Sequence, residues 1–377
     1  MPAEAKPAPA NLYVHFPFCR RKCTYCALHS RATTEAARSE YVARIAQAIP
    51  QALGGSSALS TIYFGGGSPA LCCLGPVLDA LAPFLGQCAS APEFTVEMHP
   101  LDVTREKLKE LKDGGVNRIS MGVQSLDDGI LRHMGRGYTI ADAKRAFSLV
   151  REHFDNAGID LIVGYPGDRS FERLTDGGFG LSDWGLKHCS VYSLILEESS
   201  ILAKMLERPN ESLRLPGDDE VLDQIAAVSR YLKSIGLERY EISNYAVPGC
   251  ECRHNMATWR GEDYIGLGDG AHGRRGLLRT ANWWPQPWGQ TPENWGQTPE
   301  NWGQTPEIVE ISAEKDKIER RIFSLRTREG LDAEGRPEWI GILDRFVSEG
   351  LLTKDGSRYR LTARGTEVCD TILAELV

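Results

Sequence analysis

Three closely spaced cysteines are the clearest sign of chemistry in this sequence. Cys19, Cys23 and Cys26 form a C-x3-C-x2-C array within HFPFCRRKCTYCALHS, residues 15–30. A structural zinc site usually takes four ligands in two separated pairs, and no fourth partner stands at a suitable spacing here. Three thiolates can instead hold a cubane iron-sulfur cluster in which one iron has no protein ligand and can bind a small molecule. The spacing favours such a cluster, and an unrelated metal site is the alternative.

The elements that must position these thiols alternate between two kinds of pattern up to about residue 245. Amphipathic, helix-like segments such as residues 34–49 and 139–154 lie between short apolar runs. Connections of this length imply parallel strands, and six such units predict an α/β fold that is either a closed parallel barrel or a partial (β/α)6 barrel. Chemistry then sits at the carboxyl ends of the strands, and the cysteine array directly follows the first strand. The predicted strands are 12–16, 60–64, 94–98, 118–123, 159–164 and 189–194.

The pattern changes after residue 245. A Gly-rich stretch leads into WGQTPEN repeats that begin at Trp288, Trp295 and Trp302. Each repeat contains a proline, so we interpret the repeats as a low-complexity exposed loop, with a Trp-bearing contact surface as the alternative. From residue 311, two amphipathic helices, a turn and an alternating strand predict a small helical, winged-helix-like domain used for packing. The predicted organisation is a disordered tail at 1–10, the barrel at 11–245, a motif and repeat segment at 246–310, and the winged-helix-like domain at 311–377.

Composition narrows the classes of partner. With 377 residues and 42% hydrophobic content, the chain can bury a large core. A net charge of -8 argues against a sequence-independent nucleic-acid binder, because no basic patch rises above the acidic background. No stretch approaches the roughly 18 apolar residues that a membrane helix needs, and the N-terminus lacks an apolar signal core. We therefore expect a cytoplasmic protein with no nucleic-acid partner and no integral membrane segment.

The cysteine array resembles that of the radical S-adenosylmethionine (SAM) superfamily, in which C-x3-C-x2-C follows the first strand of a βα barrel. Tyr25, just before Cys26, fits the same pattern. The resemblance implies that Cys19, Cys23 and Cys26 hold a 4Fe-4S cluster whose open iron chelates SAM. An electron from the cluster then cleaves SAM to a 5'-deoxyadenosyl radical. The implied cofactors are the cluster and SAM, and the implied electron donor is a protein such as flavodoxin or ferredoxin.

The same resemblance assigns residues to SAM. YFGGGSP, residues 63–69, puts three glycines after the second strand, where backbone N–H groups can approach an anionic or zwitterionic ligand. In the superfamily this turn meets the SAM amino group, which makes Gly66, Gly67 and Ser68 candidates. Polar side chains recur at the later strand ends, and Arg136 can supply a cation for the SAM carboxylate. The alternative for each of these polar side chains is that it is an ordinary surface residue that binds no ligand. The remaining SAM-site candidates are Tyr13, Tyr25, Glu97, Gln124 and Asp160.

Further motifs resemble one branch of the superfamily, which contains oxygen-independent coproporphyrinogen III oxidase and the HemW heme chaperones. These motifs are LYVHFPFC, GGGSP, NRISMGVQS, DLIVGYPG and YEISNYAVPGCECRHN, and the resemblance covers about residues 11–377. The oxidase has a fourth cysteine two residues past the third, where this chain has Leu28. The chaperones carry H-N-x-x-Y-W late in the chain, and this chain has HNMATW with Thr258 in place of Tyr. The resemblance implies heme as a ligand of His254, Asn255 and Trp259, with the histidine as axial ligand.

The leading functional hypothesis is a heme chaperone that binds heme and passes it to an unidentified acceptor protein. One alternative is an oxygen-independent coproporphyrinogen III oxidase that decarboxylates a propionate by radical chemistry. The other is a radical SAM heme-opening enzyme. Leu28 and the short stretch before the first strand count against the oxidase, whereas HNMATW favours the chaperone. The resemblance leaves open a homodimer.

Overall fold

The computed structural model describes residues 10–54, 58–88, 90–176, 180–207, 213–284 and 307–376. Within them the predicted α/β class is confirmed, and each of the six predicted strands is present. These strands are consecutive neighbours in one sheet and run parallel to one another. They are β1 Ala10–Phe16, β2 Leu59–Gly66, β3 Glu93–Met98, β4 Arg118–Gln124, β5 Asn156–Val163 and β6 His188–Ser193.

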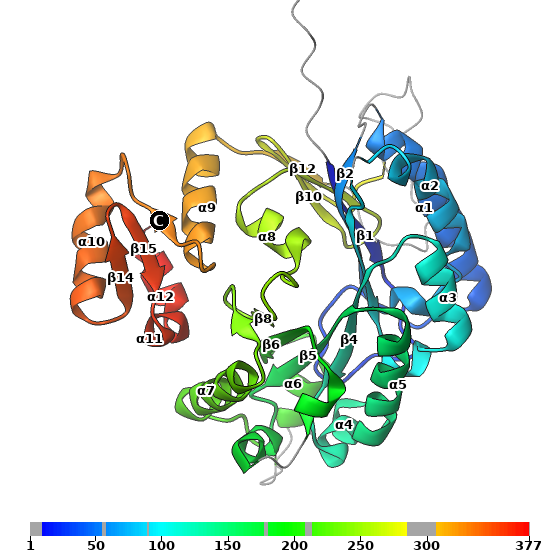
Figure 1. Ribbon diagram of the computed structural model, residues 1–377, viewed down its shortest axis with the longest axis horizontal. Coiled ribbons are helices and arrows are strands. Elements are labelled where there is room, and N and C mark those ends of the chain that lie inside the picture. Colours follow the sequence, from blue (N-terminus) through cyan, green and yellow to red (C-terminus); the bar gives the residue numbers. More distant parts are fainter. Residues whose placement is uncertain are drawn as a thin grey trace, which may run out of the picture.

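Helices α1 to α5 cover the outer side of this sheet (Figure 1). Helix α5 shows why the sequence is helical there: Thr139 and Asp142 form a capping box, and Ala143, Phe147 and Val150 are buried at helical spacing. The connection from β5 to β6 contains short 3-10 turns instead of an α-helix. The helices of this part are α1 Glu35–Leu53, α2 Gly75–Leu85, α3 Arg105–Asp113, α4 Asp128–Met134, α5 Ile140–His153, α6 Ile201–Leu206 and α7 Asp218–Ser234.

The Gly-rich segment after residue 245 adds a seventh parallel strand, which the sequence pattern did not predict. Strand β9, Tyr264–Leu267, pairs with β1 on the side away from β2. Gly266 permits the close approach of the following strand on the other side, because a Cβ atom there would lie 1.9 Å from the carbonyl oxygen of His272. Short strands then extend both edges of the sheet: β10 His272–Arg275, β11 Leu278–Ala281 and β12 Glu307–Glu310 beyond β9, and β8 Asn244–Ala246 and β7 Glu238–Arg239 beyond β6.

Strand alternation gives the barrel an apolar outside and a polar inside. In β1, Leu12, Val14 and Phe16 are fully buried in the main apolar core. Their neighbours Asn11, Tyr13 and His15 project to the other face, where Asn11 accepts a hydrogen bond from Thr61 of β2 at 2.9 Å. The same face carries Glu97 on β3, Arg118 on β4 and Asp160 on β5. Polar side chains therefore fill the interior up to the carboxyl ends of the strands.

The C-terminal residues form a second unit with its own apolar core, which includes Leu325, Leu343 and Tyr359. The two predicted helices and the hairpin occur in the predicted order as α9, α10 and β14–β15, whereas β13 between the helices and the final helices α11 and α12 were not predicted. The three strands pair as β13-β15-β14. It meets the barrel at α8, Arg253–Trp259, on the side opposite the outer helices (Figure 1). Its elements are α9 Ala313–Leu325, β13 Leu331–Asp332, α10 Pro337–Ser348, β14 Leu352–Asp355, β15 Arg358–Leu361, α11 Ala363–Glu367 and α12 Cys369–Ala374.

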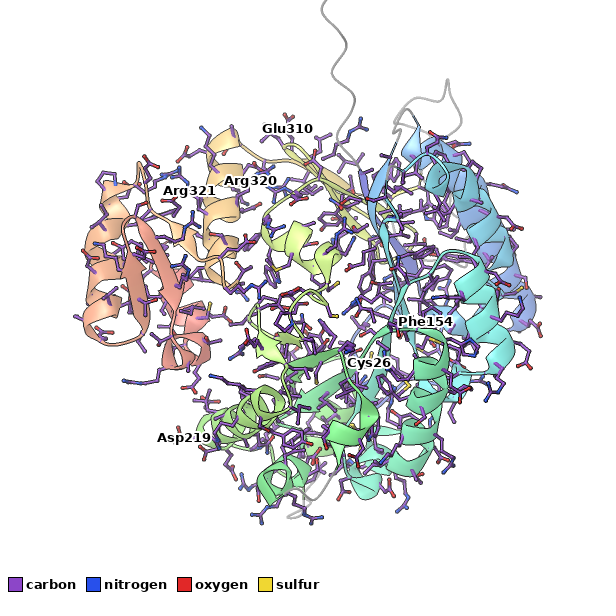
Figure 2. All side chains as sticks on the ribbon, viewed as in Figure 1. Cys26, Phe154, Asp219, Glu310, Arg320 and Arg321 are labelled. Atoms are coloured by element: carbon purple, nitrogen blue, oxygen red, sulfur yellow. The ribbon has the colours of Figure 1, made fainter. Side chains whose placement is uncertain are left out.

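Figure 2 shows Cys26 within the barrel and Arg320 and Arg321 on α9, well separated from it. None of the described helices combines the length and apolar character needed to cross a membrane. The predicted tail and the WGQTPEN repeats at Trp288, Trp295 and Trp302 lie outside the described residues, apart from Ala10, which begins β1. The predicted domain boundaries stay predictions.

Candidate functional site

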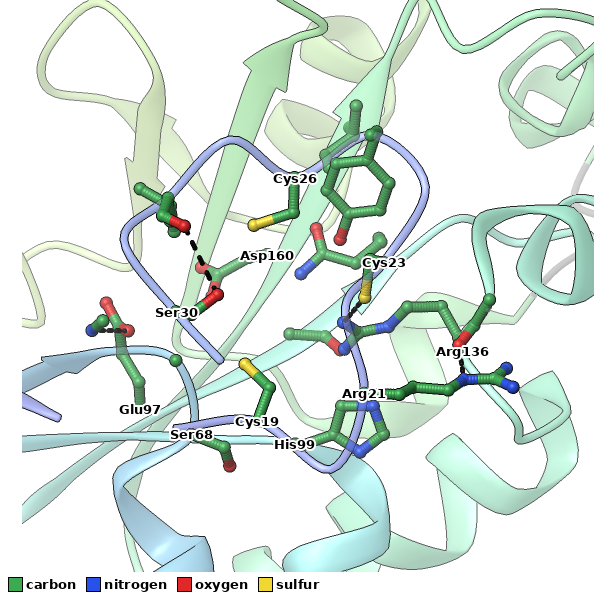
Figure 3. A pocket seen from close by; sticks show the side chains of 18 of the residues that line it. Cys19, Arg21, Cys23, Cys26, Ser30, Ser68, Glu97, His99, Arg136 and Asp160 are labelled. Carbon is green, nitrogen blue, oxygen red and sulfur yellow. Dashed lines mark hydrogen bonds between the residues drawn. The ribbon is translucent and has the colours of Figure 1, made fainter. Parts of the chain in front are cut away.

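A cavity of about 860 Å³ opens at the carboxyl ends of the barrel strands. All of the residues predicted for the cluster and SAM line it, except Tyr13 (Figure 3). They come from the cysteine loop after β1, the glycine turn at the end of β2, the next three strands, and, for Arg136, the segment between α4 and α5. The fold therefore gathers Cys19, Cys23, Tyr25, Cys26, Gly66, Gly67, Ser68, Glu97, Gln124, Arg136 and Asp160 into one site.

The cysteine loop is held at its base and at its tip. At the base, the Cys19 N–H donates to the Arg31 carbonyl at 3.0 Å, which closes the loop on itself. At the tip, the Thr24 N–H donates to the Met134 carbonyl at 3.0 Å, and the Thr24 carbonyl accepts from Leu202 at 2.7 Å. These bonds fix the loop through its backbone, independently of the thiols.

The three thiols fit a cluster larger than one metal ion. Their sulfur atoms surround a shared space (Figure 3), and no three His, Cys, Asp or Glu side chains in the described part of the chain group closely enough for a single ion. Burial raises the pKa of the Cys19 thiol, and neighbouring Cys23 and Cys26 raise it further. Three thiolates this close repel one another unless a cation compensates, so metal loading is coupled to thiol deprotonation.

The glycine turn cannot use its N–H groups as the sequence suggested. The N–H groups of Gly66, Gly67 and Ser68 donate to Glu97, to the Phe16 carbonyl and to the Phe18 carbonyl, at 3.0, 2.9 and 2.7 Å. This corrects the expectation that they approach an anionic ligand. Glycine is needed for a different reason: a Cβ atom at Gly67 would lie 2.3 Å from the Phe18 carbonyl oxygen. The turn packs directly on the cysteine loop.

Glu97 and Asp160 form an acidic pair inside the cavity. Glu97 accepts hydrogen bonds from the Tyr63 hydroxyl at 2.9 Å and from Gly66. Burial, and then the charge of Asp160, raise the pKa of Glu97 to about 7. Burial also raises the pKa of Asp160, which accepts a 2.9 Å hydrogen bond from Ser120. A bound cation would lower the pKa of both Glu97 and Asp160, because an opposite charge favours the ionised carboxylates.

Arg136 supplies the positive charge on the other side of the cavity. Its guanidinium donates to the Tyr138 hydroxyl at 2.9 Å, the Gly122 carbonyl at 2.7 Å and the Cys23 sulfur at 3.3 Å. Three of its five N–H donors are thus used by the protein. Gln124 also faces the cavity, with a φ of 77° that is uncommon for a residue other than glycine. Such strained backbone is concentrated at functional sites.

Tyr13 and His254 lie deeper in the barrel, outside the cavity lining. The His254 Nδ1 atom and the Thr61 hydroxyl share a hydrogen bond of 2.8 Å, and the imidazole ring stacks at 6.3 Å from the Tyr13 ring. The His254 residue is only 5% exposed. Burial, together with the charge of Arg118, lowers the pKa of His254 to about 4, so the ring is neutral at pH 7.

Trp259 and Asn255 lie on α8, where the barrel meets the C-terminal unit. The Trp259 ring packs edge-on against Phe323 at 6.1 Å and lies 5.6 Å from the Arg326 guanidinium carbon. Asn255 is half-buried on the same helix. The structure therefore places the HNMATW motif at the junction of the two units and separates it from the cysteine cavity.

His99 and Tyr192 are among the cavity residues that sequence reasoning did not predict. His99 accepts a hydrogen bond from the Leu101 N–H at 3.2 Å, and burial followed by nearby arginines lowers its pKa to about 2. Tyr192 lies at the end of β6 and is partly exposed. His99 could have been found, because it directly follows the predicted strand 94–98 and so stands at a strand end. Tyr192 carried no signal beyond its place at a strand end.

Comparisons with known proteins agree with this geometry. The Radical SAM superfamily model matches residues 13–174. Heme chaperone HemW of Bacillus subtilis is 30% identical, over 97% of this chain and all of the relative. This chain belongs to the HemW family.

A second HemW-family relative supports the assignment. Heme chaperone HemW of Escherichia coli is 35% identical over 71% of this chain and 70% of the relative. Among solved structures, coproporphyrinogen III oxidase (HemN) of Escherichia coli, a radical SAM enzyme, covers 99% of this chain at 22% identity with a TM-score of 0.78. At 22% identity this similarity shows that the two chains share a fold and no more. The radical SAM fold of the HemW family implies a 4Fe-4S cluster and SAM.

Exchange of Glu97 for glutamine tests the acidic side of the cavity. We expect Glu97→Gln to weaken SAM binding about ten- to a hundredfold, because a charge-assisted hydrogen bond contributes roughly 1.5–3 kcal/mol. Cluster iron content should be unchanged, since Glu97 contacts the glycine turn and Tyr63. Calorimetric titration of both proteins with SAM measures the effect, with the exposed Glu106→Gln as matched control. Equal affinities for all three proteins would remove Glu97 from the SAM site.

The same exchange should change how stability depends on pH. The folded state holds the pKa of Glu97 at about 7, above the ordinary value, so it favours the protonated form. The stabilisation that comes from protonated Glu97 is therefore complete below pH 4.5, the ordinary pKa of the carboxyl group. It is lost as the pH rises through 7, the pKa in the folded state. We expect Glu97→Gln to raise the unfolding free energy of the cluster-free protein by roughly 1–2 kcal/mol at pH 8 and little at pH 5. Urea unfolding at both pH values checks this, and an equal difference at the two values would contradict it.

Proposed function

We propose that this protein is a heme chaperone, which binds heme and transfers it to an acceptor protein, and that it carries a 4Fe-4S cluster and SAM. The observation that carries the proposal is the match to a heme chaperone over that relative's whole length. Leu28 supports it, because the oxidase branch has a fourth cysteine at this position. Heme, an acceptor protein and an electron donor such as flavodoxin or ferredoxin are the proposed partners.

The chain's own residues have distinct roles in this proposal. Cys19, Cys23 and Cys26 would hold the cluster. Glu97 and the carbonyl groups of the glycine turn would receive the ammonium group of SAM, while Arg136 would receive its carboxylate and Asp160 would face its ribose. When bound, the cluster and SAM supply one-electron chemistry. The backbone anchors of the cysteine loop keep the thiols in place for it.

The predicted heme role of His254, Asn255 and Trp259 stays a prediction. A neutral imidazole is a common heme ligand, and His254 is neutral at pH 7. The His254 hydrogen bond through Nδ1 to Thr61 would leave Nε2 as the ligating atom, but in this conformation the ring is buried where α8 packs on the barrel strands. Ligation of heme iron would therefore require α8 to withdraw from the barrel.

One anaerobic experiment separates the three candidate functions. The reconstituted protein is incubated with SAM, reductant and either heme or coproporphyrinogen III, and the tetrapyrroles are then analysed by chromatography. We expect intact heme to co-elute with the protein and to pass to apomyoglobin, a generic heme acceptor. Production of protoporphyrinogen would instead identify an oxidase. An opened linear tetrapyrrole would identify a heme-opening enzyme.

A further inference from the structure

A chain of directed hydrogen bonds holds the His254 side chain inside the barrel. The Asn11 amide group donates to the Asp263 carbonyl at 3.0 Å, which turns the Asn11 side-chain oxygen toward β2. The Thr61 hydroxyl donates its single proton to that oxygen at 2.9 Å. Thr61 can therefore only accept in its 2.8 Å contact with His254, so His254 carries its proton on Nδ1. The Nε2 atom keeps its lone pair and makes no hydrogen bond within the described residues.

A carboxylate holds the start of the same helix. Helix α8 lies on the inner side of the sheet, away from the outer helices (Figure 1). Glu93, at the start of β3, accepts hydrogen bonds from the N–H groups of Arg253 and His254 at 2.9 and 3.0 Å. The Cys252 thiol, directly before α8, is fully buried and lies 3.5 Å from the same carboxylate. The start of α8 is thus attached through polar contacts, which water can replace when the helix moves away.

The apolar contacts around α8 form a small cluster of their own, distinct from the core under the barrel sheet. The buried members of this cluster are Tyr240, Ala246, Cys252 and Met256. The helix has only seven residues and lies between Gly249 and Gly261, whose φ angles of 88° and 66° favour glycine. Both glycines can serve as pivots. A short element with a small apolar contact opens locally at a lower free energy than a strand of the core.

We propose that Thr61, oriented by Asn11, is a positioning residue that latches His254 inside the barrel, and that heme binds only when this latch opens. In the closed state His254 is 5% exposed, so heme iron cannot reach its Nε2 atom. When α8 moves away, the Nε2 lone pair becomes available to the iron, while water satisfies Thr61 and Glu93. The inference rests on the proposed function, and it adds that the latch opposes heme binding instead of supporting it.

The latch ties heme affinity to the opening of α8. A ligand that binds only the open state has its apparent affinity reduced by the fraction of molecules that are open. While opening is rare, a substitution that makes it more frequent should therefore raise the heme affinity by the same factor. Thr61→Val keeps the shape of the side chain and leaves His254 and Asn11 without their partner in the closed state. We expect it to favour opening at least about fivefold.

Alkylation of Cys252 measures the opening directly. The cluster-loaded protein is treated anaerobically with N-ethylmaleimide, with and without heme, and the peptide that contains Cys252 is quantified by mass spectrometry. Heme should raise the alkylation rate of Cys252 at least about threefold, because a ligand of the open state shifts the population toward it. Cys189 is fully buried in the core of the barrel sheet and serves as the internal control. It should stay protected under both conditions.

Substitutions separate the latch from the ligand, with heme affinity measured by Soret titration. Thr61→Val should raise the heme affinity and the heme-free alkylation rate of Cys252 by the same factor. Thr61→Ser keeps the hydroxyl group and should match the wild type in both. His254→Ala should raise the alkylation rate and lose the Soret shift of bound heme. Ser125→Ala removes a buried hydroxyl that donates to Asp168 after β4, and it should change neither quantity.

The outcomes distinguish this inference from the proposed function. Heme affinity that is unchanged or lower in Thr61→Val would overturn the latch and keep the chaperone. Heme binding to the wild type with no rise in Cys252 alkylation would do the same. Equal alkylation of Cys189 and Cys252 in Thr61→Val would also overturn the latch, because the whole barrel would then be opening. A wild-type protein that binds no heme would overturn the proposed function and this inference together.

Discussion

Replacing Cys19, Cys23 and Cys26 together with alanine is expected to remove the iron of the reconstituted protein. Iron content should fall from roughly four atoms per chain to below about 0.5, because no other thiols line the cavity. The broad visible absorption of the cluster should disappear with it. The fold should persist, since the loop is anchored through backbone bonds at Thr24 and Cys19 that alanine can also make.

The control for this prediction replaces thiols that lie elsewhere. Cys73 is exposed and Cys250 is half-buried, and neither lines the cavity. The Cys73→Ala, Cys250→Ala double variant should keep its full iron content and absorption. Iron analysis, visible spectra and far-ultraviolet circular dichroism of the three proteins measure the difference. A triple variant that still binds about four irons would show that the cluster lies elsewhere.

Removing Arg118, a buried cation of the barrel, should cause the largest loss of stability. Arg118 is 2% exposed, and its Nη1 atom donates to Thr95 across 3.4 Å. The nearby carboxylate of Glu93 accepts hydrogen bonds from the N–H groups of Arg253 and His254, at 2.9 and 3.0 Å, and so fixes the start of α8. Arg118→Met would leave that buried carboxylate without its neighbouring cation. We expect Arg118→Met to lower the free energy of unfolding by roughly 3–5 kcal/mol, which is a large part of the stability of a typical domain.

A double-mutant cycle isolates the charge effect in Arg118→Met. Adding Glu93→Gln neutralises the carboxylate, so the double variant should be less destabilised than the sum of the two single exchanges by at least about 0.5 kcal/mol. Arg145→Met supplies the matched surface control, because Arg145 is exposed and pairs with Asp142 on the same helix. Arg145→Met should lower the free energy of unfolding by about 0–1 kcal/mol. Urea unfolding of the set gives the coupling, and strict additivity would contradict an electrostatic role for Arg118.

The sequence alone determined the part of the fold that local pattern controls. The six apolar runs from residue 12 to residue 194 became strands β1 to β6, because apolar side chains at alternate positions must all face the helices. The C-x3-C-x2-C spacing predicted three thiols as ligands of one cluster, and their position after the first strand placed them at the carboxyl end of the barrel. Parallel strands end at one edge, so Glu97, Gln124 and Asp160 converge there with the cysteines.

Tertiary structure decided the features that depend on contacts distant in sequence. Strand β9 has a glycine inside a four-residue run, and its pairing with β1 and β10 makes it a strand. The N–H groups of the glycine turn are satisfied by Glu97 and by carbonyl groups at the end of β1 and in the cysteine loop, contacts that no local pattern reveals. Likewise, His254 is buried because α8 packs on Glu93 and Thr61. Both of these residues lie more than 160 positions earlier in the sequence. Burial and hydrogen-bond partners are properties of the assembled fold, and they decide whether a polar side chain meets a ligand or the protein itself.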